Sequence, residues 1–150
     1  MPDLHLIRSS RMQICPYLFF DGNCIEAFNE YAKILNGKVA HIQTYGESPE
    51  GIPTPEGKDD KVMHAQVHFG DQIIMGSDSP MEYKEPTGMF VSAGFDSVER
   101  AAEVYKALAD GGVERMPFAK TFWSEGFGMV TDRFGISWIV NTDEMPGTGE

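Results

Sequence analysis

The hydrophobic pattern of this chain begins with a short apolar run, and an amphipathic segment follows it. Residues 14–20 (ICPYLFF) form an apolar run of strand length, which ends at a turn-forming Asp-Gly-Asn triplet at 21–23. Between residues 25 and 35 the apolar side chains recur at spacings of three and four, which places them on one face of a helix. Asn36 and Gly37 are residue types that end helices. The segment therefore predicts a buried strand followed by a helix.

The second half of the chain repeats this order. Residues 90–95 (FVSAGF) predict a strand, residues 98–108 have helical periodicity, and an Asp-Gly-Gly triplet at 110–112 ends the helix. At an offset of 74, Tyr105 takes the place of Tyr31. Self-similarity of this kind indicates an internal repeat, so we expect two copies of one module.

Further apolar segments complete each module with additional strands. FGDQII (69–74) aligns with FGISWI (134–139) at an offset of 65, so both modules are expected to close on a hairpin. The additional strands are predicted at 38–45, 62–69 and 72–77 in the first module and at 114–118, 127–131 and 136–141 in the second. One helix can cover only one face of such a sheet. We therefore expect an α+β fold in which two βαβββ modules form a curved mixed sheet with a concave cup, the natural place for a ligand.

These elements also predict the domain boundaries. We expect an N-terminal extension at 1–12, a single domain at 13–144 and a C-terminal tail at 145–150. Within the domain, the first module covers about 13–80 and the second about 88–144. A chain of 150 residues is long enough for one domain whose halves share a core.

Charge and cysteine content exclude several classes of protein. The net charge is −11, and no stripe of lysine and arginine is present that could offset the repulsion from a phosphate backbone, so we expect no nucleic-acid partner. No segment reaches the ~18 apolar residues of a membrane-spanning helix, so we expect no membrane partner. Cys15 and Cys24 form no C-x-x-C motif, and free thiols are typical of a cytoplasmic protein.

Four sequence blocks spread over residues 13–144 resemble one protein family. They are PYLFFDGNCIEAFNEYAKILNGKV (16–39), VMHAQVHFGDQIIMGSD (62–78), FW (122–123) and GMVTDRFGISWIVNTDE (128–144). In this combination the chain resembles the PhnB-like proteins of the vicinal-oxygen-chelate superfamily, which includes glyoxalases, bleomycin-resistance proteins and extradiol dioxygenases. The resemblance implies the glyoxalase/bleomycin-resistance fold of paired βαβββ modules, and it implies a homodimer. Some relatives carry a methyltransferase label, but this chain has no glycine-rich strand-to-helix turn that would hold S-adenosylmethionine.

Enzymes of that superfamily hold a divalent metal with His and Glu side chains from the first and last strands of each module. The corresponding positions here are Pro16, Ile74, Phe90 and Ile139. None of these side chains can bind a metal, so we expect no metal centre and no cofactor. The same register places Cys15, Tyr17 and Phe19 on the face of the first strand that packs against the helix.

Five side chains are predicted to contact a ligand: His64, Gln66, His68, Trp123 and Asn141. The first three alternate along one strand and therefore share one face, and a metal held by the two histidines is the alternative interpretation. Trp123 could stack on a planar ligand or fill the core. Asn141 could orient a ligand carbonyl or cap the end of its strand.

Three functional hypotheses follow. The first is a protein that binds a small aromatic or carbonyl-bearing molecule in the cup without a metal. The second is a metal-dependent lyase, isomerase or dioxygenase like the glyoxalase relatives, and the third is a structural or partner-binding dimer. The fold alone cannot choose among them, because function resides in the site, so whether the chain is an enzyme stays open at this stage.

Overall fold

The computed structural model describes residues 12–48, 54 and 56–143. The predicted C-terminal tail and all but the last residue of the predicted N-terminal extension lie outside the described residues. The first module contains β1 (Tyr17–Phe20), α2 (Cys24–Ile34), β2 (Lys38–Thr44), a 3-10 helix (Tyr45–Glu47), β3 (Val62–Phe69) and β4 (Gln72–Asp78). The second contains β5 (Val91–Phe95), α3 (Val98–Ala109), β6 (Val113–Ala119), β7 (Phe127–Thr131) and β8 (Ser137–Thr142).

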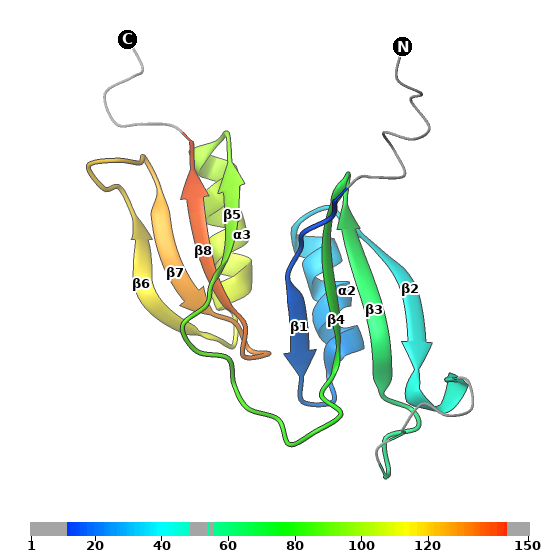
Figure 1. Ribbon diagram of the computed structural model, residues 1–150. Coiled ribbons are helices and arrows are strands. Elements are labelled where there is room, and N and C mark those ends of the chain that lie inside the picture. The colour runs from blue at the N-terminus through cyan, green and yellow to red at the C-terminus, as the bar shows by residue number, and fades with distance from the viewer. Residues whose placement is uncertain (1–11, 49–53, 55, 144–150) are drawn as a thin grey trace, which may run out of the picture.

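The strands form two four-stranded mixed sheets, and the α+β fold with two βαβββ modules is confirmed. The strand orders are β1-β4-β3-β2 and β5-β8-β7-β6, in which β1–β4 and β5–β8 are parallel and the other pairs antiparallel. The two sheets lie side by side with β1 next to β5, and α2 and α3 cover the same side of both (Figure 1). We call the opposite side of each sheet its open face. Within the described part of the chain, no helix is long and apolar enough to cross a membrane.

Each helix packs its apolar face against its own sheet. The buried side chains of α2 are Cys24, Ala27, Phe28 and Tyr31, and those of α3 are Ala101, Val104, Tyr105 and Leu108. Ala27 and Tyr31 correspond to Ala101 and Tyr105 at the offset of 74 that the sequence repeat predicts. Burial of each large apolar side chain contributes about 1.5–3 kcal/mol, so these two helix faces account for much of the core.

The predicted orientation of β1 is wrong. Leu18 and Phe20 are buried against the helix side, whereas Tyr17 and Phe19 are 42% and 47% exposed on the open face. Cys15, two residues before Tyr17, is half-buried. A strand that is apolar on both faces has no alternation of polar and apolar residues, so its sequence does not reveal which face is buried.

The predicted alignment of β4 with β8 is also wrong by one residue. The sequence aligned the two strands at an offset of 65, but their pairing with β1 and β5 gives an offset of 64. Tyr17 lies beside Met75, while in the second module Ser92 lies beside Ile139, so Met75 rather than Ile74 corresponds to Ile139. The cause is the turn at 132–136, which is longer than the turn at 70–71. Ile74 therefore lies on the helix side of its sheet, whereas Ile139 lies on the open face. Pro16 is also on the helix side, because it alternates with the buried Leu18 along the chain.

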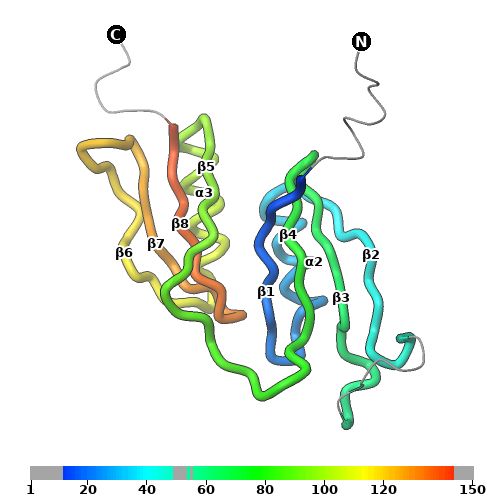
Figure 2. The backbone as a smooth tube through the Cα atoms, viewed as in Figure 1, coloured from blue at the N-terminus to red at the C-terminus, as the bar shows by residue number. Residues whose placement is uncertain are grey.

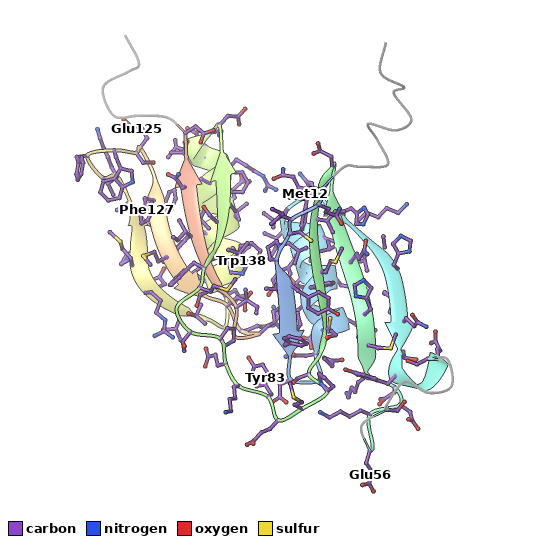
Figure 3. The ribbon with its side chains drawn as sticks, in the orientation of Figure 1. Met12, Glu56, Tyr83, Glu125, Phe127 and Trp138 are labelled. Carbon is purple, nitrogen blue, oxygen red and sulfur yellow. The ribbon has the colours of Figure 1, made fainter. Side chains whose placement is uncertain are left out.

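A buried polar cluster joins the two modules. The Asp132 carboxylate of the β7–β8 turn accepts hydrogen bonds from the Tyr31 hydroxyl of α2 at 2.5 Å and from the Trp138 indole nitrogen of β8 at 2.9 Å. It also accepts from the backbone nitrogens of Phe134 and Ile136 at 2.9 and 3.0 Å. Trp138 is 1% exposed and sits where the two modules meet (Figure 3). The backbone tube shows the same arrangement, with the β7–β8 turn reaching toward the first module (Figure 2).

Candidate functional site

A row of hydrogen-bonded polar side chains crosses the open face of the first sheet. The Tyr17 hydroxyl lies 3.1 Å from His64 Nδ1, and His64 Nε2 lies 3.2 Å from Gln66 Nε2. The Gln66 Oε1 atom lies 2.9 Å from His68 Nε2. His64, Gln66 and His68 come from β3 at alternate positions, which is why all three project to the same face. We call these four side chains the polar row.

Aromatic rings surround the Tyr17 end of the polar row. The Tyr17 ring stacks on the His64 imidazole with a centroid distance of 5.7 Å and an interplanar angle of 30°. Phe19 follows on the same face of β1, with its ring centroid 5.4 Å from that of Tyr17. This end of the row therefore combines hydrogen-bonding atoms with exposed ring faces, on which a planar ligand could stack.

A cavity of about 130 Å³ opens beside these rings, where β1, β5 and the segment between β4 and β5 meet. Its lining includes Tyr17, Phe19, Met89, Phe90, Val91 and Ser137, together with the exposed Lys84. The walls are mostly apolar. A cavity of roughly 150 Å³ with apolar walls is large enough for a single benzene ring, so this one is close to the size of a one-ring ligand.

The open face of the second sheet is apolar where the first is polar. Met116, Met129 and Ile139 occupy one row across β6, β7 and β8. Trp123 packs edge-on against Phe127, with ring centroids 5.3 Å apart. Trp123 is 40% exposed, so it does not fill the core, and its ring is open to a ligand.

Asn141 is held by a serine that the sequence did not single out. The Ser124 Oγ atom lies 3.0 Å from Asn141 Oδ1 and also 2.8 and 2.9 Å from the carbonyl oxygens of Gly126 and Thr142. Ser124 is almost fully buried, and it fixes both the loop before β7 and the Asn141 side chain at the end of β8. Asn141 lies beside Phe127 in the paired strands, near the Trp123 ring.

The five predicted site residues thus form two groups. His64, Gln66 and His68 lie together on the first sheet, while Trp123 and Asn141 lie on the second. Among the described residues, no hydrogen bond or ring contact links one group to the other. Their role in ligand binding stays a prediction. Tyr17 and Phe19 belong with the first group and were missed, because the uniformly apolar β1 sequence gave no signal for its exposed face.

Metal-ligating side chains are scattered over the described part of the molecule. No group of three or more His, Cys, Asp or Glu side chains converges there in a way that could hold a metal ion. Gln66 separates the two histidines of the polar row and forms a hydrogen bond with each. The Nε2 atoms of His64 and His68 both face the Gln66 amide, which occupies the space between them.

Among the buried groups with shifted pKa values, Cys24 and Asp132 are the ones whose chemistry could suggest a site. Burial raises the pKa of the Cys24 thiol, and the nearby Asp78 carboxylate raises it further, so this thiol stays protonated and is not a nucleophile. Burial also raises the pKa of Asp132, against the lowering effect of its four hydrogen bonds. Both groups serve the structure, since Asp132 joins the modules and Asp78 accepts from the Cys24 and Val62 backbone nitrogens.

Comparison with known proteins places this chain in a family. The sequence pattern of the family described as 3-demethylubiquinone-9 3-methyltransferase matches residues 12–141. Protein YjdN of Escherichia coli is 33% identical over 151 residues, which is 91% of this chain and 99% of that protein. The crystal structure of protein PA1353 from Pseudomonas aeruginosa is 41% identical, covers 89% of this chain and 98% of its own, and superposes with a TM-score of 0.81.

Two further solved structures are similar to this chain, one in sequence and fold and the other in fold alone. A PhnB protein from Bacillus cereus, described as a putative 3-demethylubiquinone-9 3-methyltransferase, is 26% identical over 87% of this chain and 99% of its own, with a TM-score of 0.73. The fosfomycin resistance protein FosX from Mesorhizobium loti is only 8% identical over 91% of this chain and 94% of its own, with a TM-score of 0.58, which shows a shared fold alone. The chain therefore belongs to the family described as 3-demethylubiquinone-9 3-methyltransferase, is similar to a PhnB protein, and shares its fold with FosX.

Proposed function

We propose that this chain binds a small aromatic or carbonyl-bearing molecule in a cup made by the open faces, without a metal centre. The observation that carries the proposal is the polar row that ends at Tyr17, beside an apolar cavity of about 130 Å³. Apolar walls with a few convergent polar atoms are the usual composition of a small-molecule site. The net charge of −11 opposes anions at long range, so a neutral ligand fits best.

The proposed ligand places its ring in the cavity and its polar atom at the polar row. The ring would contact Tyr17, Phe19 and Phe90, and the polar atom would reach the hydroxyl–imidazole pair. Trp123 and Phe127 form a separate aromatic surface on the other sheet, outside the lining of this cavity. Burial of about 100 Å² of ring surface contributes about 2.5 kcal/mol and one hydrogen bond about 1 kcal/mol. A one-ring fragment should therefore bind with a Kd of roughly millimolar strength, which suits detection by thermal shift or NMR.

We do not assign the methyl transfer that the family description names. The turn between β1 and α2, Asp21-Gly22-Asn23, has a single glycine, whereas nucleotide-type cofactors are usually held by a glycine-rich turn at this place in a fold. The polar row instead supports binding of a neutral molecule.

The experiment that tests the proposal combines metal analysis with a thermal-shift panel. Protein purified without chelator should contain no stoichiometric zinc, nickel, iron or manganese, and aromatic aldehydes and ketones should raise its Tm by mass action. His64→Ala should reduce the shift, whereas Lys106→Ala, a change on the exposed side of α3, should not. Stoichiometric metal together with a Tm increase on adding that metal would favour a metal-dependent enzyme instead.

We also propose that the chain forms a homodimer and acts in the cytoplasm. Large apolar side chains remain exposed on the isolated chain, among them Ile14, Phe122 and Met81, and a second copy is the simplest partner to cover some of them. Both cysteines are free thiols, which agrees with a reducing compartment. Light scattering after size exclusion tests the first point, with a mass near 16.7 kDa for the species in solution contradicting it.

A further inference from the structure

Three hydrogen-bonded side chains join β6, β7 and β8 on the open face of the second sheet, and the last of them lines the cavity of about 130 Å³. The Arg115 Nε atom of β6 lies 3.0 Å from the Thr131 Oγ1 atom of β7. That oxygen lies 2.9 Å from the Ser137 Oγ atom of β8. Ser137 belongs to the cavity lining, whereas Arg115 and Thr131 lie outside it. Ser137 is therefore the member of this chain of contacts that a ligand in the cavity could reach.

The order of the strands places the Ser137 hydroxyl between Thr131 and the cavity. β8 lies between β7 and β5 in the second sheet, and Ser137 pairs with Thr131 on the β7 side (Figure 1). On the other side β8 pairs with β5, whose first residue Val91 lines the cavity together with Phe90. Among the described residues, Thr131 is the only hydrogen-bond partner of the Ser137 hydroxyl. The side of this hydroxyl that faces β5 and the cavity is thus left for a ligand.

The Arg115 guanidinium favours one direction for these hydrogen bonds. A guanidinium nitrogen can only donate, so the Thr131 oxygen accepts from Arg115 and its own hydrogen needs an acceptor. Thr131 is 5% exposed, and Ser137 Oγ is the acceptor within reach of its hydroxyl in the described part of the chain. A buried donor without an acceptor is costly, so Thr131 donates to Ser137. The positive charge of Arg115, which none of the ion pairs between described residues includes, orients both hydroxyl dipoles in the same direction.

We infer that Ser137 determines ligand specificity by donating its hydroxyl hydrogen to a carbonyl oxygen of the bound molecule. The inference rests on the proposed function and narrows it to a neutral one-ring ligand that has a carbonyl group on the side of the second sheet, in addition to the polar atom at the polar row. Arg115 and Thr131 are positioning residues, because they orient the Ser137 hydroxyl from outside the cavity. A molecule of the same shape without the carbonyl would leave this donor unpaired and bind more weakly.

Two phenols of similar shape test the inference on the full chain, at a pH where both are neutral. Both para-hydroxyacetophenone and para-ethylphenol carry a hydroxyl group for the polar row, but only the first carries a carbonyl group. NMR titration of the isotope-labelled chain should show that the wild type binds the ketone about two- to tenfold more tightly, the range that one hydrogen bond supplies. The carbonyl carbon of the bound ketone should also shift to higher frequency, as it does when a carbonyl oxygen accepts a hydrogen bond.

Four variants separate the roles of the residues. Ser137→Ala should abolish both the preference for the ketone and its carbonyl shift, while leaving para-ethylphenol binding unchanged. Ser137→Thr, which keeps the hydroxyl and suits a strand, should retain the preference. Arg115→Met, at an exposed position of the edge strand β6, should cause partial loss of the preference without changing para-ethylphenol binding. Ser92→Ala is the matched control, since Ser92 lies beside Ile139 on the same open face but outside the cavity lining, and it should behave like the wild type.

The contrary results affect the inference and the proposed function differently. Equal binding of the two phenols, or a ketone preference that persists in Ser137→Ala, would show that Ser137 does not donate, while binding itself would still support the proposed function. A ketone preference that is unchanged in Arg115→Met would contradict the positioning role of Arg115. Failure of both phenols to bind would instead contradict the proposed function and the inference together.

Discussion

Asp132 is the residue whose replacement should best reveal how the two modules are joined. Its carboxylate accepts four hydrogen bonds in a buried site, from Tyr31 of the first module and from Trp138 and two backbone nitrogens of the second. In Asp132→Asn the amide oxygen can keep the two backbone bonds. The amide nitrogen can donate to the Tyr31 hydroxyl but meets the Trp138 indole N–H, which then has no acceptor.

The structure sets the expected magnitude. One buried donor without an acceptor costs about 1–3 kcal/mol, and loss of the charged acceptor adds about 1 kcal/mol, so Asp132→Asn should lower the free energy of unfolding by roughly 2–4 kcal/mol. In a Trp138→Phe background the indole N–H is absent. The same substitution should therefore cost about 1–2 kcal/mol less there, which is a measurable coupling in a double-mutant cycle.

Urea unfolding followed by circular dichroism and tryptophan fluorescence provides the assay, and coincident transitions would show that the modules unfold together. Asp71→Asn is the matched control, since Asp71 occupies the exposed turn of the corresponding hairpin in the first module. The control should stay within about 0.5 kcal/mol of the wild type. If Asp132→Asn changed stability no more than the control does, or cost the same in both backgrounds, the reasoning about this cluster would be refuted.

Three further predictions concern stability. Gly76→Ala should destabilise by about 1–3 kcal/mol in urea unfolding, because its Cβ would lie 2.7 Å from a β1 carbonyl oxygen, whereas Gly94→Ala, whose nearest neighbour would be 3.8 Å away, should be tolerated. Ser97→Ala removes the side chain that caps α3 and should cost about 1 kcal/mol, while Asn23→Ala, which loses no capping bond, should cost less in the same assay. Burial raises the pKa of Tyr105 to about 12. The folded state therefore favours the neutral phenol. This preference adds to the free energy of unfolding below pH about 10, and the added stability is lost as the pH rises through about 12. Stability measured across this range should fall by about 3 kcal/mol more in the wild type than in Tyr105→Phe, and equal losses would contradict it.

The fold could be predicted because its signals are local. Helical spacing over residues 25–35 and 98–108, glycines at the helix ends and the repeat offset of 74 each reflect contacts within one module. Such periodicity is the part of a sequence that translates most directly into structure.

The candidate site was only partly predictable. His64, Gln66 and His68 could be grouped because three polar residues alternate along one strand. Tyr17 could not, since its orientation depends on the pairing of β1 with β4, which an all-apolar strand does not specify. The hydrogen bond between Tyr31 and Asp132 spans 101 positions in the chain and rests on how the modules meet, for which no local pattern exists.

The measurement that tests the central claim most directly is an NMR titration of the isotope-labelled chain with para-fluoroacetophenone, in which every backbone amide is followed. The account predicts that shift changes concentrate on β1, β3 and β5 around Tyr17, His64 and Phe90, and that the exposed surfaces of α2 and α3 do not respond. Shift changes confined to the helix side of the sheets, or none at concentrations well above the expected millimolar Kd, would contradict the assignment of the open face as the binding site.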